Sequence, residues 1–241
     1  MKKIIFLLLA VFAIFGCSSK NKSFTLTVTA QEDAELTDGS AVALTYRAKV
    51  GEKDSTFIFK APLQNGVATI KGSTDGIYRA GLYILESIDS QIEGRAAAML
   101  FLENTNYDIA IGRDEIEVNG GGELQKVSDS LSKLVNNLYE EANFKALQDA
   151  YMADRENNAL LDSLMKVGSK LQEDAIEITN SYIAANPTSI YALNDANDNK
   201  YYISVDSLRG LVSLFENDGK LLNSNLFQAL KSTLSERESV A

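Results

Sequence analysis

The chain has 241 residues and a formal net charge of −10 at pH 7, with no histidine, no tryptophan and a single cysteine. The negative charge disfavours binding to nucleic acid phosphates. Without histidine, serine–histidine and cysteine–histidine catalysis and histidine-containing zinc sites are excluded. One cysteine forms neither an intramolecular disulfide nor a Cys-x-x-Cys redox pair. Hydrophobic residues make up 45% of the chain, which is enough for a folded core.

The N-terminus has the pattern of a secretory signal. Two lysines precede an apolar run over residues 4–15, and the small residue Gly16 stands before Cys17. The run is shorter than the roughly 20 residues of a membrane-spanning helix. This arrangement resembles a bacterial lipoprotein signal. We therefore expect removal of residues 1–16 and attachment of acyl chains such as palmitate to Cys17. An ordinary signal with a chance cysteine is the alternative.

A short polar segment follows the signal. Residues 17–22 contain no carboxylate, and their composition is typical of a flexible tether. Ser18 stands where an aspartate would indicate retention in the inner membrane. We therefore expect the protein to contact a membrane through the lipid on Cys17, at the outer membrane and facing the periplasm.

Residues 23–119 show the two-residue alternation of β-strands. The first such segment alternates Phe24, Leu26 and Val28 with threonines. Asn65-Gly66 favours a tight hairpin turn. Strands are predicted at residues 24–29, 42–49, 55–60, 67–71, 77–85, 96–103, 107–111 and 116–118. This pattern predicts an antiparallel β-sandwich or a partly closed barrel.

Residues 123–236 change to the three- and four-residue spacing of helices. Gly120-Gly121-Gly122 separates the two halves, and we interpret it as a linker. Either Thr188 or Ser189 is a predicted N-cap, Ser204 is another, and Gly219 follows a helix end. Helices are predicted at residues 124–142, 156–185, 190–193, 205–215 and 222–234. The predicted fold class is therefore α+β, with a β domain followed by a helical region.

Four residues have the spacing of an EF-hand calcium loop: Asp195, Asn197, Asn199 and Asp206. That loop needs glycine at its sixth position and a glutamate at its twelfth. Here Lys200 occupies the sixth position and Asp206 the twelfth. We interpret the segment as a polar loop between helices and predict no metal and no cofactor, with calcium as the less favoured alternative.

Two other kinds of candidate site are present. Paired carboxylates support glycoside hydrolysis only when a cleft holds them at a defined separation, so we interpret the acidic clusters as solvated surface. Tyrosines near the helices are candidates to line a ligand groove, with core packing as the alternative. The acidic clusters are Glu32, Asp33 and Glu35, and Glu140-Glu141; the tyrosines are Tyr182 and Tyr201-Tyr202.

Several short segments occur in an order seen in a known family. They are Phe24–Val28, Asn65–Gly72, Leu102–Tyr107, Val118–Gly121 and Ala185–Leu193. In this order they resemble the N-terminal region of lipid-anchored thiol-disulfide oxidoreductases (thioredoxin-like, AhpC-type) from anaerobic gut bacteria. That family carries a β domain of unknown function, a helical segment and a thioredoxin-like domain. The Cys-x-x-Cys pair is missing here, so the resemblance implies no catalytic residue in this chain.

These observations predict a non-catalytic envelope lipoprotein that binds a partner protein or a small ligand. The resemblance implies an alternative, an accessory subunit of an extracytoplasmic thiol-disulfide redox system that acts with a separate thioredoxin-like protein. A third hypothesis is an envelope enzyme that uses carboxylates alone, which would need a carboxylate pair in a pocket.

Overall fold

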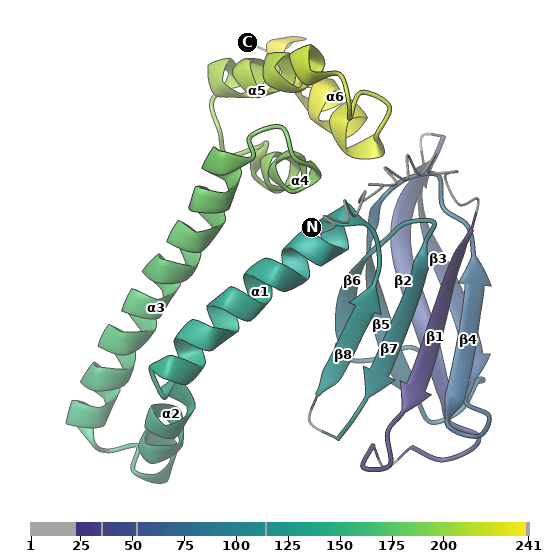
Figure 1. Cartoon of the computed structure of the whole chain (residues 1–241), viewed down its shortest axis with the longest axis vertical. Helices are drawn as coiled ribbons and strands as arrows, with labels where there is room; N and C mark the ends of the chain where they lie inside the picture. Colours follow the sequence, from purple (N-terminus) through teal and green to yellow (C-terminus); the bar gives the residue numbers. More distant parts are fainter. Residues whose placement is uncertain (1–22, 35, 52, 114, 240–241) are drawn as a thin grey trace, which may run out of the picture.

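A computed structural model of the chain describes residues 23–34, 36–51, 53–113 and 115–239. The predicted signal, Cys17 and the tether lie outside these ranges. The first half of the described chain forms two four-stranded sheets packed face to face (Figure 1), with strand orders β4-β1-β7-β8 and β3-β2-β5-β6. The strands are β1 (Phe24–Ala30), β2 (Ala41–Val50), β3 (Lys53–Pro62), β4 (Val67–Gly72), β5 (Tyr78–Leu85), β6 (Ala98–Leu102), β7 (Asn106–Ile111) and β8 (Ile116–Gly120).

The predicted α+β fold with a β-sandwich is confirmed, whereas the partly closed barrel is not formed. The two sheets stay separate, so β4 and β8 are the edges of one sheet and β3 and β6 are the edges of the other. One pairing also differs from a wholly antiparallel arrangement, because β1 and β7 run parallel. Alternation along a strand specifies which face is buried but not the direction of its neighbour.

The sandwich core lies between the sheets and follows the alternation of the strands. Phe24, Leu26 and Val28 are all fully buried, while the threonines between them point outward. Tyr107 of β7 is also fully buried within this core. Burying one such side chain stabilises a fold by roughly 1.5–3 kcal/mol, so this face determines how the sheets pack.

The second half of the described chain consists of helices. In Figure 1, α1 and α3 run side by side as an arm that extends away from the sandwich, and α2 lies at the far end of this arm. No helix in the described ranges is long and apolar enough to cross a bilayer. The helices are α1 (Glu123–Glu141), α2 (Phe144–Ala153), α3 (Asn158–Ala185), α4 (Ile190–Asn199), α5 (Val205–Asp218) and α6 (Asn225–Ser239).

The predicted helix caps form, and of the two alternatives for α4 the structure has Ser189 as the cap. The hydroxyl oxygen of Ser189 accepts a hydrogen bond from the Ala192 N–H at 3.2 Å, and that of Ser204 accepts one from the Ser207 N–H at 3.1 Å. Gly219 ends α5 with φ of 78°, a conformation that favours glycine. No helix is predicted at residues 144–153, where α2 forms, because ten residues carry too little periodicity to distinguish a helix from a loop.

The last three helices form a second core at one end of the sandwich. Its centre is apolar and buried, and Leu124 at the start of α1 belongs to it. Ile77 and Phe101 from the sandwich pack against this core. The buried residues of α4, α5 and α6 in this core are Ile190, Ala192, Leu193, Ala196, Leu208, Val212, Phe215, Phe227, Leu230 and Leu234.

The arm is much less buried than either core. α3 has 28 residues and would measure about 42 Å as a straight helix, yet its only buried residue is Leu171. No residue of α2 is buried, and all of α2 lies within the described ranges. Helices in proteins are stabilised mainly by packing of their apolar faces, so the arm leaves apolar surface available.

Candidate functional site

The junction between the sandwich and the helices is fixed by Asn225, the first residue of α6. Its side-chain oxygen accepts a hydrogen bond from the Ile77 N–H at 3.0 Å, and its amide nitrogen donates to the Ile77 carbonyl at 2.8 Å. A Cβ added to Gly76 would lie 2.5 Å from the Asn225 side chain, so glycine is needed for this close approach. The two residues joined are 148 positions apart in the sequence.

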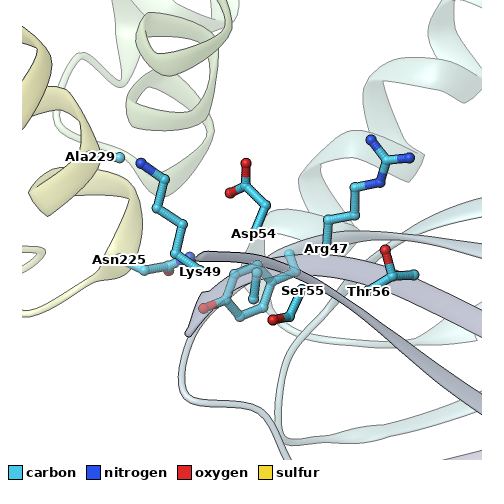
Figure 2. Close-up of a pocket in the computed structure, with 9 residues that line it drawn as sticks. Arg47, Lys49, Asp54, Ser55, Thr56, Asn225 and Ala229 are labelled. Atoms are coloured by element: carbon cyan, nitrogen blue, oxygen red, sulfur yellow. The ribbon is translucent and has the colours of Figure 1, made fainter. Parts of the chain in front are cut away.

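A cavity of about 680 Å³, here called the junction pocket, opens beside this contact. Three strands of one sheet and the first turns of α6 line it (Figure 2). Pockets of this size at the boundary between two packed units commonly bind small molecules. Its lining residues are Arg47, Ala48 and Lys49 of β2, Asp54, Ser55 and Thr56 of β3, Tyr78 of β5, and Asn225 and Ala229 of α6.

Strand register explains how the polar groups of the junction pocket come together. Arg47 lies opposite Thr56, and Lys49 lies opposite Asp54, in the antiparallel pair β2–β3. Directly opposite residues share a face of the sheet. In Figure 2 the Arg47, Lys49 and Asp54 side chains extend on the same side, with the Asp54 carboxylate between the two cations. Within the described ranges, neither Arg47 nor Lys49 forms an ion pair.

Tyr78 lines the junction pocket, and its ring belongs to a stack of aromatic side chains packed in or against the sandwich core. The Tyr78 ring stacks on Tyr46 with 5.2 Å between ring centroids, and Tyr46 stacks on Phe57 at 4.9 Å. The Tyr78 hydroxyl donates a hydrogen bond of 2.7 Å to the Asp75 carboxylate. Burial, and secondarily this hydrogen bond to Asp75, raises the pKa of Tyr78. The phenol therefore stays neutral at physiological pH.

A second candidate surface, here called the arm groove, lies between α1 and α3. Two adjoining cavities of about 620 and 510 Å³ share Leu131, Leu134 and Tyr182. Their apolar residues recur at three- and four-residue spacing on both helices, so each helix contributes one continuous stripe. The apolar and aromatic lining consists of Val127, Leu131, Leu134 and Leu138 of α1 and Ile178, Tyr182 and Ala185 of α3.

Charges along the arm groove are mostly negative. Glu123, Asp174 and Glu177 line it, against the single cation Lys126. Asp174 also accepts a hydrogen bond of 2.5 Å from Lys170 one turn earlier on α3. Leu134 lies within the groove, and its exposed fraction is 52%. The surface is therefore apolar along its floor and acidic along its rim.

A third cavity, of about 580 Å³, lies between the free edges of β6 and β8 and α1. Two buried side chains form hydrogen bonds with backbone groups at the edge of β6. Gln125 accepts a hydrogen bond from the Phe101 N–H at 2.7 Å, and the Tyr107 hydroxyl donates to the Phe101 carbonyl at 2.7 Å. Gln125 also donates to Asp129 at 2.7 Å, and burial raises the pKa of Asp129. These bonds protect the edge from pairing with another strand.

The predicted calcium candidates do not lie on a loop. Asp195, Asn197 and Asn199 belong to α4, which continues through the segment predicted to be irregular, and Asp206 lies in the first turn of α5. The Asn197 amide donates to the Leu226 carbonyl at 2.7 Å, which ties α4 to α6. No cluster of three or more metal-ligating side chains of the His, Cys, Asp and Glu types occurs in the part of the chain that the structure describes.

The fold does not bring the predicted acidic clusters and tyrosines together in one site. Glu32, Asp33, Glu140 and Glu141 are exposed, and Glu35 lies outside the described residues. Tyr182 does line the arm groove, as one of the two predicted alternatives states. Tyr201 and Tyr202 are exposed at 64% and 88% in the turn after α4. The sequence interpretation missed Arg47, Lys49 and Asn225, because only strand register and a contact between distant segments bring them together.

Comparisons with models of protein families, with curated proteins and with solved structures found no match for this chain. The resemblance to the oxidoreductase N-terminal region therefore stays a prediction. The junction pocket and the arm groove are the candidate binding surfaces of the described residues.

Proposed function

We propose that this chain is a non-catalytic envelope lipoprotein, anchored by acyl chains on Cys17, that uses its helical arm to bind a partner protein. The observation that carries the proposal is the arm groove. Two helices present matched apolar stripes with no third element of the described chain packed over them. Grooves of this form bind amphipathic helices through anchors spaced by three and four residues.

The charge of the groove indicates which helix it would accept. Its lining has three carboxylates and one lysine, so basic residues flanking an apolar stripe complement it. A second copy of this chain would bring another strongly acidic surface, since the net charge is −10. An anionic membrane surface would be repelled in the same way. The proposed occupant is therefore a basic amphipathic helix of another envelope protein.

A site-specific crosslinking experiment on the full chain in its native envelope tests this proposal. A photoreactive amino acid replaces Leu134 in one variant and Ile176 in another. These two side chains are matched in exposed fraction, 52% for Leu134 and 53% for Ile176. They differ in position, because only Leu134 lines the groove. We expect crosslinks from position 134 to a partner segment that has an apolar three–four stripe and net positive charge. Position 176 should give background levels only.

The crosslinked segment decides between the hypotheses. A partner with a thioredoxin-like domain would favour the accessory subunit of a thiol-disulfide redox system. A crosslink from position 134 to a second copy of this chain, or to a segment without basic residues, would contradict the proposed occupant. Equal yields from both positions would contradict the groove as the binding surface. In a matched pair of substitutions, Leu134→Lys should lower partner recovery about tenfold or more, and Ile176→Lys should leave it unchanged.

A further inference from the structure

We propose that the junction pocket is a binding site for a small organic anion that also carries hydroxyl groups, the chemistry shared by sugar acids and sugar phosphates. This site is separate from the arm groove in the fold and uses different residues. It adds ligand binding to the proposed docking of a partner protein.

The cations Arg47 and Lys49 are the reason to expect an anionic group on the ligand. Arg47 and Lys49 line the pocket, and each lies two residues from the other on the same face of β2. Both side chains are exposed, and no carboxylate in the described ranges is within ion-pair distance of either. In a chain with a large excess of acidic residues, two such cations at one cavity favour a carboxylate or phosphate.

The position of Asp54 favours an anion that carries hydroxyl groups over an inorganic anion. Its carboxylate lies between the two cations in Figure 2, so it would repel any purely anionic ligand. An ionised carboxylate is an acceptor only, and ligand hydroxyl groups are suitable donors to it. Thr56, which lies opposite Arg47 on the same face of the sheet, adds a hydroxyl group that donates as well as accepts. The lining therefore has partners for an anionic group and for hydroxyl groups next to it.

The wall of the pocket is fixed before any ligand binds. Asn225 holds α6 to the sandwich through its two hydrogen bonds with Ile77. Tyr78 is held by stacking on Tyr46 and by its hydrogen bond to Asp75. A ligand that enters therefore orders mainly the side chains of Arg47 and Lys49, which lowers the entropic cost of binding.

Isothermal titration calorimetry on the full chain in detergent tests the assignment. The probes are D-glucuronate, D-glucose 6-phosphate, D-glucose and inorganic phosphate. We expect at least one of the two sugar anions to bind, and D-glucose and inorganic phosphate to bind about tenfold more weakly or worse. Binding of glucuronate alone identifies a carboxylate site, and binding of glucose 6-phosphate alone identifies a phosphate site; either result supports the proposal.

Variants connect the binding to this pocket. Arg47→Gln and Lys49→Gln should each weaken binding of the sugar anion about tenfold, whereas Lys71→Gln, an exposed lysine on β4 of the same sandwich, should leave it unchanged. Asp54→Asn should improve the binding of inorganic phosphate, because it removes the repulsion. Absence of binding by both sugar anions, equal binding of D-glucose, or an equal loss in Lys71→Gln would overturn the proposal. Leu134→Lys should not affect these titrations, so failure at the arm groove and failure here are distinguishable.

Discussion

Glu103 carries a carboxylate oxygen that is buried and has no hydrogen-bond partner among the described residues. The side chain lies against the start of α1, since a Cβ added to Gly122 would be 1.5 Å from this oxygen. Burial, and secondarily the nearby charge of Glu123, raises the pKa of Glu103, while Lys126 acts in the opposite direction. A side chain at position 122 would therefore require the Glu103 carboxylate to move.

Glu103→Gln should raise the free energy of unfolding at neutral pH by about 1 kcal/mol or less, because it removes a charge whose burial is only partly screened by solvent. The pKa of Glu103 is raised in the folded state, so the folded state binds more protons and the wild type loses stability as pH rises from the unfolded to the folded pKa. Urea unfolding of both proteins from about pH 4 to pH 8 measures the difference. The advantage of the variant should shrink at the acidic end, and a constant difference would contradict this origin.

Among the elements, α6 is joined to the sandwich by apolar packing and by two hydrogen bonds from a single side chain, Asn225. Asn225→Ala removes both hydrogen bonds to Ile77 and leaves its N–H and carbonyl without these partners. The expected loss is about 1–3 kcal/mol in the free energy of unfolding, measured by chemical denaturation. Asn180→Ala on the exposed surface of α3 is the matched control and should cause no loss. An equal effect in both variants would show that the junction contributes little to stability.

The helical arm should open more readily than the rest of the chain. α2 and α3 together contain one buried residue, whereas α4, α5 and α6 are centred on a buried core. Local opening is easiest where few apolar contacts are buried. Hydrogen–deuterium exchange read by mass spectrometry should therefore show amide protection about tenfold or more lower in α2 and α3 than in α4–α6. Equal protection in the isolated protein would contradict this, and protection of the arm only when a partner is bound would agree with the proposed docking.

For the chain as a whole, the proposed lipid on Cys17 would attach the protein to the membrane. Cys17→Ser should transfer the protein from the membrane fraction to the soluble fraction after cell disruption, because it removes the proposed acylation site. Ser18→Ala keeps the cysteine and should stay in the membrane fraction. Labelling with a palmitate analogue should be lost in the first variant only. Retention of Cys17→Ser at the membrane would point to attachment through a partner protein.

Local patterns predicted most of the elements in this fold. The eight strands follow the two-residue alternation that begins at Phe24, and the caps at Ser189 and Ser204 follow from side chains that bond to nearby backbone groups. The elements that sequence reasoning missed have weak local signals. α2 is short, and the end of α4 is rich in asparagine and aspartate, which also favour loops. Asn197 keeps its place in that helix through a bond to the distant Leu226 carbonyl.

The periodicity of neighbouring residues was enough to predict the class of the fold and the division near Gly120. Composition was enough to exclude histidine chemistry and disulfides within the chain. The sequence also supplied the prediction of a lipid anchor at Cys17, which lies outside the described structure. Three features could not be predicted in this way: the open sandwich formed by the sheets, the position of Arg47 and Lys49 beside α6, and the groove between α1 and α3. These features arise from strand pairing and helix packing between residues far apart in the chain. Local sequence patterns do not specify such contacts.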